Sequence, residues 1–177
     1  RRRPMKRVLL VGSGGSGKST LARRLGARLG LEVIHLDKLY WLPGWVEPPK
    51  EVWEKKVEEL CARRAWVMDG NYSGTLEQRL AACDTAVFLD LPRALCLWRV
   101  LKRAVLYRRG GRPDVAEGCP ESFNLEFFLW VWNYPERSRP KVLKLLEKHA
   151  HEKRIVRLRS RAEVEKFLAQ LEEGPAV

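Results

Sequence analysis

The segment that predicts the architecture of this chain is Val8-Leu9-Leu10-Val11-Gly12-Ser13-Gly14-Gly15-Ser16-Gly17-Lys18-Ser19. Its first four residues form an apolar run rich in branched side chains, which is typical of a buried strand. After the glycines, Leu21, Leu25 and Leu29 recur every four residues up to Gly30, which predicts a helix with a glycine stop. The segment therefore predicts a strand, a glycine-rich turn and a helix in immediate succession.

The glycine-rich turn, residues 12–19, matches the pattern G-x-x-x-x-G-K-[ST] in the strand-to-helix context that this pattern requires. Glycines let consecutive backbone N–H groups face a phosphate, and the helix N-terminus adds partial positive charge. We expect Lys18 to reach the outer phosphates of a nucleoside triphosphate and Ser19 to offer an oxygen to Mg²⁺. The alternative is a glycine-rich turn without a ligand. The expected nucleotide-binding residues are Gly12, Ser13, Gly14, Gly15, Ser16, Gly17, Lys18, Ser19, Thr20 and Arg99.

Further short apolar segments predict strands that alternate with helices. These segments are Val33–Asp37, Ala65–Asp69, Ala86–Asp90 and the half-polar Ile155–Leu158. The alternation predicts a three-layer α/β fold, with a parallel sheet covered on both faces, in one domain over residues 1–177. Ligands bind beyond the carboxyl ends of such strands, where the pattern places Gly12, Asp37, Asp69 and Asp90.

Apolar spacing and capping residues predict the helices, and the glycine- and proline-rich segments 40–49 and 108–120 predict loops. The expected helices are one from Pro49 with a stripe at Trp53, Val57, Leu60 and Cys61, a short one over Thr75–Ala82, one from Pro92 to about Tyr107, one with a stripe at Leu125, Phe128, Leu129 and Trp132, and a last one with a capping box at Ser160 and Glu163.

The composition narrows the class of protein. Of 177 residues, 45% are hydrophobic and 32% charged, which excludes disordered and fibrous proteins. No apolar run approaches the roughly 20 residues that a membrane span needs, so we expect no membrane integration. Cys61, Cys83, Cys96 and Cys119 stand too far apart for a zinc site or a disulfide framework, which favours a reducing cytoplasm. The net charge of +12 favours an anionic partner, either nucleic acid or a phosphorylated compound.

Two aspartates end predicted strands where a metal ion or a helix N-terminus would use them. Asp69 either holds Mg²⁺ through water, as the second half of a nucleoside triphosphate site, or caps a helix. Asp90 offers the same chemistry, but Pro92 follows it where a helix starts. We therefore interpret Asp90 mainly as a helix cap.

Arginines gather in the second half of the chain. Arg99 and Arg103 lie four residues apart on one face of a predicted helix, and the glycine-rich loop follows. If this loop folds over the carboxyl edge of the sheet, its arginines neutralise the charge of a phosphoryl group in transfer. The alternatives are a solvated basic face and a nucleic-acid patch. The arginines of the loop and of the next helix end are Arg108, Arg109, Arg112, Arg137 and Arg139.

The phosphate-binding pattern, Asp69-Gly70, and Asp90-Leu91-Pro92 ahead of Arg99 and Arg103 resemble adenylate kinases and related P-loop kinases. The chain is more similar to a smaller bacterial group, described as DNA topology modulation proteins or adenylate-kinase-like ATPases. This resemblance runs from about Val8 to Ala169. The segments that carry it are His35-Leu36-Asp37, Pro43-Gly44-Trp45, Asp69-Gly70-Asn71-Tyr72-Ser73-Gly74, Arg112-Pro113-Asp114 and Glu117-Gly118-Cys119-Pro120-Glu121.

The resemblance implies a five-stranded parallel sheet in the order 2-3-1-4-5, a helical lid around 107–121 and an acceptor-binding region around 37–64. It also implies ATP and Mg²⁺ as cofactors. The implied roles are phosphate contact for Lys18, Arg99 and Arg103, metal binding for Ser19 and Asp69, and a position after the lid for Arg137 and Arg139, of which we expect Arg137 to be catalytic.

The acceptor-binding region departs from adenylate kinases, which hold the phosphate of AMP with an arginine there and another after the Asp-Gly pair. Here no arginine lies between Arg28 and Arg63, and Asn71 and Tyr72 follow Asp69-Gly70. We therefore do not expect a clamp for AMP.

Carboxylate, amide and aromatic groups remain in this region. A carboxylate with aromatic walls suits a neutral, hydroxyl-bearing acceptor, and by analogy with small-metabolite kinases Asp37 accepts the hydroxyl proton. The alternatives are a helix cap for Asp37 and core packing for Trp41 and Trp45. His35 lies within a predicted strand and is interpreted as a core residue. The expected acceptor-binding residues are Asp37, Trp41, Trp45, Asn71 and Tyr72.

Three functional hypotheses follow. The first is an ATP- and Mg²⁺-dependent kinase of a small molecule, nucleoside or nucleotide, a monomer or weak homodimer in the cytoplasm. The second is a nucleotide-switched ATPase that binds DNA, which the charge permits although no DNA-reading motif is evident. The third is a partner of a membrane surface or ribonucleoprotein held by Arg1-Arg2-Arg3, although Met5-Lys6-Arg7 resembles a natural start and no apolar signal core follows it.

Overall fold

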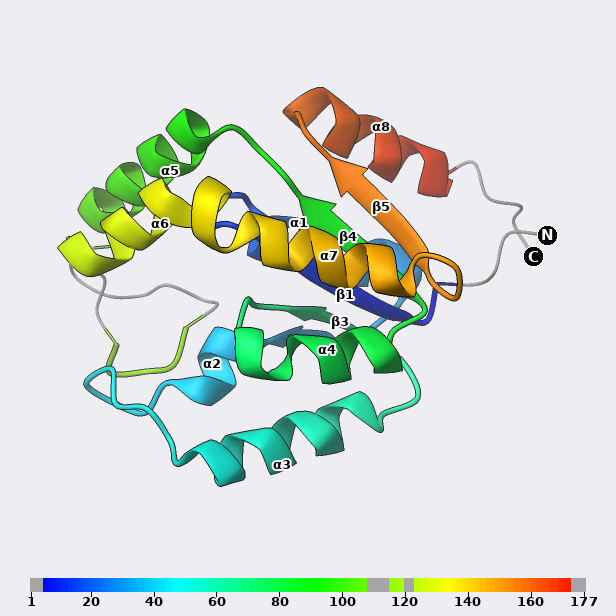
Figure 1. The fold of residues 1–177 in the computed structure, drawn as a ribbon, viewed down its shortest axis with the longest axis horizontal. Helices are drawn as coiled ribbons and strands as arrows, with labels where there is room; N and C mark the ends of the chain where they lie inside the picture. The colour runs from blue at the N-terminus through cyan, green and yellow to red at the C-terminus, as the bar shows by residue number, and fades with distance from the viewer. Residues whose placement is uncertain (1–4, 108–114, 120–122, 173–177) are drawn as a thin grey trace.

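The computed structural model describes residues 5–107, 115–119 and 123–172 (Figure 1). Its strands are β1 (Arg7–Gly12), β2 (Val33–His35), β3 (Trp66–Asp69), β4 (Thr85–Leu89) and β5 (Arg154–Leu158). Its helices are α1 (Lys18–Leu29), α2 (Leu36–Tyr40), α3 (Lys50–Cys61), α4 (Ser73–Ala82), α5 (Arg93–Leu106), α6 (Leu125–Arg137), α7 (Arg139–His149) and α8 (Arg161–Glu172). Within the described ranges no helix is both long and apolar enough to cross a membrane.

The strands form one parallel sheet in the order β2-β3-β1-β4-β5, as predicted. Alternate side chains of β1 point to opposite faces of the sheet. Leu9 and Val11 pack with α3, α4 and α7 on one face, whereas Val8 and Leu10 pack with α1 and α8 on the other (Figure 1). The result is the predicted three-layer arrangement, with both faces of the sheet in an apolar core.

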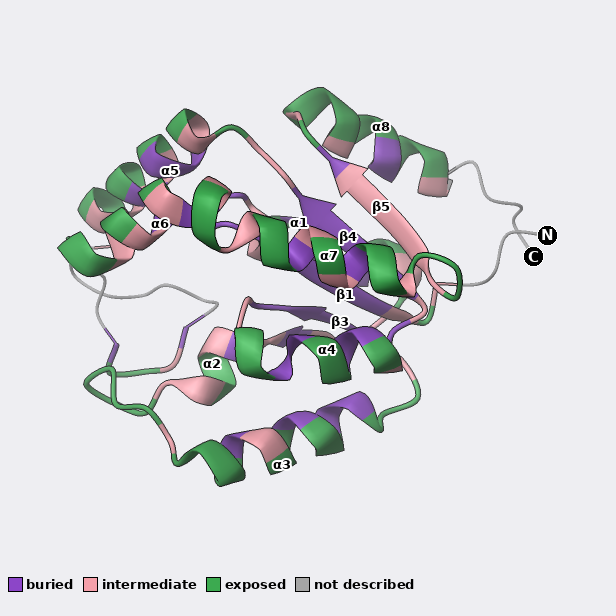
Figure 2. Cartoon of the chain, in the orientation of Figure 1, coloured by how far each residue is buried: buried purple, intermediate pink, exposed green. Residues whose placement is uncertain are grey.

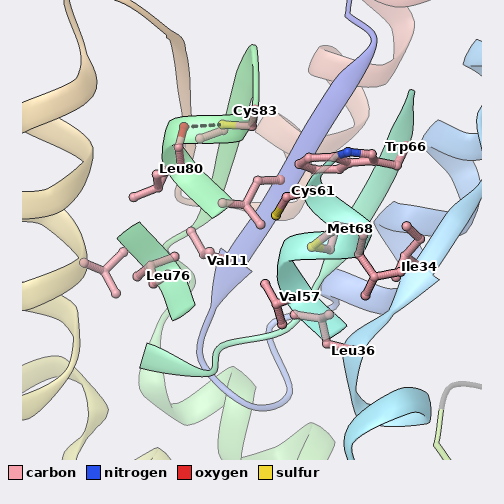
Figure 3. Packing of buried hydrophobic residues seen from close by; sticks show 14 of the residues in the cluster. Val11, Ile34, Leu36, Val57, Cys61, Trp66, Met68, Leu76, Leu80 and Cys83 are labelled. Carbon is pink, nitrogen blue, oxygen red and sulfur yellow. Dashed lines mark hydrogen bonds between the residues drawn. The ribbon is translucent and has the colours of Figure 1, made fainter. Parts of the chain in front are cut away.

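The core lies around the central strands. β1, β3 and β4 are almost wholly buried, whereas the edge strand β5 is mostly half-buried, in keeping with its half-polar sequence (Figure 2). Between the sheet and α3 lie Val57 and Cys61, which contribute to a cluster with Trp66 and Met68 (Figure 3). The predicted stripe of α3 is therefore confirmed.

The end of β2 differs from the sequence prediction, whereas the start of α8 agrees with it. β2 ends at His35, so Asp37 is not the last residue of a strand but lies in the first turn of the short helix α2. Ser160 caps α8 as predicted, because Glu163 N donates to Ser160 Oγ at 3.1 Å. The Glu163 carboxylate accepts from Arg159 N at 2.7 Å, one residue before the amide that a capping box uses.

The helix predicted from the stripe at Leu125, Phe128, Leu129 and Trp132 is confirmed as α6, but most of this stripe is not buried. Leu125, Leu129 and Trp132 are exposed, and the buried positions are Val131 and Tyr134. The reason is tertiary packing: α6 lies against α5 and the glycine-rich turn, and Val131 joins a cluster with residues of α5. Helix periodicity alone could not distinguish this face from the more apolar one beside it.

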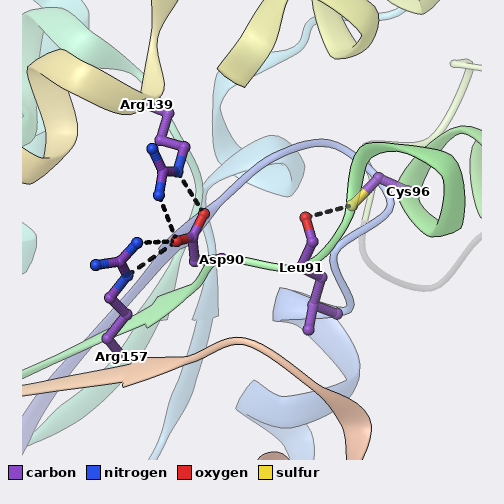
Figure 4. A network of polar contacts seen from close by, with 5 residues as sticks. All are labelled: Asp90, Leu91, Cys96, Arg139 and Arg157. Atoms are coloured by element: carbon purple, nitrogen blue, oxygen red, sulfur yellow. Dashed lines mark hydrogen bonds and ion pairs between the residues drawn. The ribbon is translucent and has the colours of Figure 1, made fainter. Parts of the chain in front are cut away.

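Asp90 is not a helix cap. It lies directly after β4, and its carboxylate accepts hydrogen bonds from Arg139 Nε at 2.8 Å and Arg157 Nη2 at 2.5 Å (Figure 4). The N-cap of α5 is Pro92, and no side chain caps that helix. Burial alone would raise the pKa of Asp90, but the hydrogen bonds from the two arginines outweigh it and hold the pKa below its ordinary value. Asp90 therefore ties α7 to the two strands at one edge of the sheet.

Asp90→Asn is expected to lower the free energy of unfolding by about 2–3 kcal/mol at pH 7, less than a fully buried pair would lose because both arginines are about one third exposed. A carboxylate whose pKa is lowered by folding stabilises the protein above its ordinary pKa, and this contribution is lost as the pH falls through the folded value. Urea unfolding should therefore show a difference that narrows below pH 3.8. Glu32→Gln, which breaks the exposed pair with Arg63, is the control and should cost less than about 1 kcal/mol. An equal loss in both variants would contradict this assignment.

Candidate active site

A cavity of about 1250 Å³ lies at the carboxyl edge of the sheet. Two groups of residues line it. The nucleotide half contains Gly14, Gly15, Ser16, Gly17, Lys18, Ser19, Thr20 and Arg99. The acceptor half contains Asp37, Trp41, Trp45, Asn71 and Tyr72. The cavity thus joins most of the residues that the sequence assigned to the two ligands.

The glycine-rich turn wraps around the ammonium group of Lys18. Lys18 Nζ donates to Gly12 O at 2.9 Å and to Ser13 O at 2.8 Å, so these first two residues of the turn face the lysine rather than line the cavity. Ser16 Oγ is buried and has no hydrogen-bond partner among the described residues. Gly14 is required for close packing, because a Cβ there would lie 2.6 Å from the Phe127 ring of α6. The turn therefore presents an ammonium group and, among the described residues, an unpartnered hydroxyl group of the kind that bind phosphate.

Burial lowers the pKa of Lys18 to about 8, although the carboxylates of Asp69 and Asp37 act in the opposite direction. A phosphate beside the ammonium group would raise this pKa again. Binding of Mg·ATP should then take up a proton above pH 8, so that affinity is constant below pH 8 and falls about tenfold between pH 7 and pH 9. Calorimetry at pH 7 and pH 9 measures this change in the affinity for Mg·ATP. Lys18→Met is the control, and its affinity should not depend on pH in this range. A wild-type affinity independent of pH up to 9 would contradict the assignment of Lys18 to the phosphates.

Asp69 lies between a serine of the nucleotide half and a histidine of β2. Ser19 Oγ donates to Asp69 Oδ2 at 2.6 Å, and His35 Nδ1 lies 2.6 Å from Asp69 Oδ1. The register of the sheet explains the second contact, because β2 and β3 pair His35 directly with Asp69. The His35 side chain is mostly buried, in keeping with its interpretation as a core residue, and it contacts Asp69 from behind without lining the cavity. Asp69 is not a helix cap, since α4 begins only at Ser73.

Ser19 and Asp69 fit a magnesium site. Mg²⁺ prefers oxygen ligands and is usually bound by one or two protein groups together with waters and substrate phosphates. The hydroxyl of Ser19 and the carboxylate of Asp69 meet beside the cavity and supply such oxygens. Over the described part of the chain there is no group of three or more His, Cys, Asp or Glu side chains that would form a cage for a metal ion. The donor set thus suits an ion held jointly by protein and phosphate.

The acceptor half is built around Asp37. Tyr72 Oη donates to Asp37 Oδ1 at 2.5 Å, and Asn71 Oδ1 accepts from Gly12 N at 3.4 Å. Burial raises the pKa of Tyr72, and the adjacent Asp37 carboxylate raises it further, so the phenol stays protonated and acts as the donor. Asp37 is not the N-cap of α2, which is His35.

Aromatic rings surround this carboxylate. Trp41 and Trp45 pack edge to face, with ring centroids 5.3 Å apart, and both line the cavity. Trp45 is 37% exposed, so these two rings are not core residues. Tyr40 and Trp53 lie beneath Tyr72 in a second aromatic group.

The predicted arginines divide into two sets. Arg99 Nη1 donates to Gly15 O and Ser16 O at 3.4 and 3.3 Å, and Arg103 also lines the cavity. Arg137 is exposed at the end of α6 and is not among the described residues that line the cavity. Its predicted contact with phosphate is therefore not found.

Arg139 is bound to Asp90 and serves the ion pair rather than the cavity. The loop arginines Arg108, Arg109 and Arg112 lie outside the described residues.

Part of the predicted lid contacts the acceptor-binding region. Gly44 N donates to Gly118 O at 2.9 Å, and Cys119 Sγ donates to Leu42 O at 3.3 Å. Residues 115–119 thus pack on the loop that carries Trp45. The structure describes no other part of the segment 108–122.

Several residues in or beside the site were not predicted to lie there. The register of β2 against β3 brings His35 to Asp69, and the predicted strand order, which places these two strand ends side by side, could have indicated it. Phe127 and Trp130 line the cavity from α6, but the stripe of that helix was assigned to a different face. Arg24 and Glu165 form a bidentate pair beside the nucleotide half, and no motif marks them.

No protein-family model matches the chain. A protein of Bacillus subtilis (strain 168), named uncharacterized protein YqaC, is 26% identical over 132 residues, which cover 73% of this chain and 72% of that protein. Its name states no function. The resemblance to DNA topology modulation proteins therefore stays a prediction.

Similar solved structures exist for the whole fold. A shikimate kinase from Acinetobacter baumannii in complex with shikimate has a TM-score of 0.55 and 22% identity, over 96% of this chain and 92% of that one. A gluconokinase from Sinorhizobium meliloti 1021 has a TM-score of 0.52 and 18% identity, over 97% of this chain and 96% of that one. At identities of 22% and 18%, the similarity shows that the fold is shared, and only the fold. The chain has the three-layer α/β fold of P-loop kinases, with the sheet order β2-β3-β1-β4-β5.

Proposed function

We propose that this chain is an ATP- and Mg²⁺-dependent phosphotransferase that transfers the γ-phosphoryl group to a hydroxyl of a small molecule, nucleoside or nucleotide. The observation that carries the proposal is the shared cavity: the phosphate-binding turn with Lys18 forms one half, and the Asp37–Tyr72 pair with its tryptophans forms the other. The fold neighbours support it, since their names are those of kinases and one is bound to shikimate.

The residues on each side have distinct tasks in the proposed reaction. Lys18 and Arg99 hold the phosphates and neutralise charge that develops during transfer. Ser19 and Asp69 would hold Mg²⁺, which would offset the charge of the phosphates when bound. The acceptor oxygen forms a bond to the γ-phosphorus while the bond to the β–γ bridging oxygen breaks and ADP leaves. The hydroxyl proton passes to the carboxylate of Asp37.

The acceptor half favours an uncharged, hydroxyl-bearing region of the acceptor at Asp37. A buried phosphate dianion needs cationic partners, whereas this half offers carboxylate, amide, phenol and indole groups from its described residues. Hydroxyl groups can donate to Asp37, and apolar ring faces can pack on Trp41 and Trp45. Nucleosides and polyhydroxylated metabolites meet both requirements.

A coupled assay of ADP formation with Mg·ATP tests the proposal, alone and with a panel of nucleosides, nucleotides and hydroxylated metabolites. Stimulation by one class, with formation of a phosphorylated product, is the expected result. Hydrolysis of ATP that no acceptor alters would refute transfer to a small molecule.

A second candidate function is the nucleotide-switched ATPase that binds DNA and modulates its topology, suggested by the resemblance to that group and by the net charge of +12. DNA binding of this kind weakens steeply with salt, because phosphate contacts release counterions. Acceleration of ATP hydrolysis by DNA at 50 mM salt, lost at 200 mM salt, would favour this function. Equal hydrolysis with and without DNA would exclude it.

A further inference from the structure

Arg79 lies on α4 behind the cavity and holds the turn that follows β3. Its side chain is fully buried, with 0% exposure. Nη1 donates to Gly70 O at 3.0 Å, and Nη2 donates to Asn71 O at 2.7 Å and Tyr72 O at 2.9 Å. Nε donates to Thr75 Oγ1 at 3.2 Å. One guanidinium group therefore binds three consecutive carbonyl oxygens of a single turn.

A charged group at this position is costly unless it has a specific task. Burial lowers the pKa of Arg79 to about 10, the sign of a strongly desolvated guanidinium. An apolar side chain would fill a core position of α4 without that penalty. What only arginine supplies is a planar set of donors that satisfies several carbonyl groups at once.

The turn itself needs support. Gly70 has φ 143° and Tyr72 has φ 23°, and the second value lies in a region that residues with a side chain rarely adopt. Backbone of this kind persists where the surrounding structure holds it, and it concentrates at functional sites. The carbonyl oxygens of these two residues are among the acceptors of Arg79.

The side chains of the same turn shape the cavity. Tyr72 Oη donates to Asp37, and Asn71 accepts from the amide of Gly12. The conformation that Arg79 holds therefore sets the distance between Tyr72 and Asp37. It also sets the position of the acceptor half relative to the phosphate-binding turn.

We propose that Arg79 is a positioning residue of the acceptor half: through the carbonyl groups of residues 70–72 it keeps Tyr72 in place to donate to Asp37. This inference rests on the proposed function and deepens it, since it names the residue that shapes the acceptor half of that site. Arg79 touches neither ligand, so its loss should affect acceptor use and spare nucleotide binding.

Arg79→Lys tests the proposal, because an ammonium group keeps the charge but lacks the planar donors. Hydrogen exchange of the amides of residues 70–74 should become at least about tenfold faster, since the turn opens locally. The Kd for Mg·ATP should stay within about twofold, and kcat/KM for the acceptor found in the panel should fall about 10²-fold through misplacement. Leu80→Val, a buried change on the same helix, is the control for lost stability and should leave kcat/KM and this local exchange unchanged.

Coupling to Tyr72 distinguishes positioning from general packing. Tyr72→Phe should lower kcat/KM in the wild-type background but have little further effect in Arg79→Lys, because the two changes remove the same interaction. Full additivity would overturn the proposal. If Arg79→Lys does not fold, Thr75→Val serves instead, since Thr75 Oγ1 accepts from Arg79 and donates to Tyr72 O at 3.2 Å. Local exchange in residues 70–74 should again increase.

The test separates this inference from the proposed function. If the wild-type protein phosphorylates no compound of the panel, the proposed function fails, while exchange and Mg·ATP binding still decide the role of Arg79. Unchanged exchange at residues 70–74 overturns the inference. So does faster exchange spread over the whole sheet, or a loss of Mg·ATP affinity as large as the loss of kcat/KM.

Discussion

Lys18→Met is expected to lower phosphoryl transfer by at least about 10²–10³-fold, the range for removal of one group that stabilises charge in a transition state. The ammonium group of Lys18 is the cation enclosed by the phosphate-binding turn, and its desolvation makes a phosphate partner favourable. Methionine keeps the length and apolar stem of the side chain but removes the charge. The measurement is kcat for ADP formation with the acceptor identified in the panel.

The fold should survive this change, because a desolvated charge is removed and no apolar contact is lost. Circular dichroism should show the wild-type fold, and urea unfolding should show a loss of no more than about 2 kcal/mol, because Gly12 O and Ser13 O lose their hydrogen bonds to Lys18 Nζ. Lys6→Met is the matched control: Lys6 is exposed at the opposite edge of the sheet, and its replacement should leave kcat unchanged. Wild-type turnover in Lys18→Met would remove Lys18 from the reaction.

Asp37→Asn is expected to lower kcat by about 10²–10⁴-fold, the contribution of a general base to proton transfer. Asparagine can still accept the hydrogen bond from Tyr72 and keeps the shape of the side chain, but it does not take up the proton of the acceptor hydroxyl. The Kd for Mg·ATP should therefore change less than about threefold. Single-turnover kinetics and calorimetry measure the two quantities separately.

Asp84→Asn is the control for this variant. The carboxylate of Asp84 accepts from the amides of Lys6 and Arg7 at the amino end of the sheet, away from the cavity. The same chemical change there should affect stability and leave kcat and ATP affinity unaltered. Parallel losses of kcat and ATP affinity in Asp37→Asn would assign Asp37 a structural role instead.

The parts of the fold that depend only on the pattern of neighbouring residues in the sequence were predicted correctly. The strand, glycine-rich turn and helix from Val8 to Gly30 follow from apolar periodicity and one motif, and both are properties of adjacent residues. The sheet order was predicted from a resemblance, and the structure confirms it. Placement of Asp69 beside the phosphate-binding turn then follows from strand direction alone, and Asp37 lies nearby because α2 begins directly after β2.

The sequence predictions fail for residues whose surroundings depend on contacts with distant parts of the chain. Asp90 follows a strand and precedes a proline, which is typical of a cap, yet Arg139 and Arg157 come to it from distant parts of the chain. Arg79 lies in a helix with no motif around it, and only the folded turn of residues 70–72 reveals its contacts. The apolar face of α6 depends on what the helix packs against, and two candidate faces were available.

The fate of the γ-phosphoryl group tests the central claim most directly. Protein incubated with γ-³²P-labelled ATP, Mg²⁺ and the acceptor panel is quenched, and the labelled products are separated. We predict that label appears in one organic phosphate, and that Lys18→Met and Asp37→Asn each lower the rate of its formation at least about 10²-fold. Label found in inorganic phosphate alone, whichever acceptor is present, would contradict transfer to a small-molecule hydroxyl.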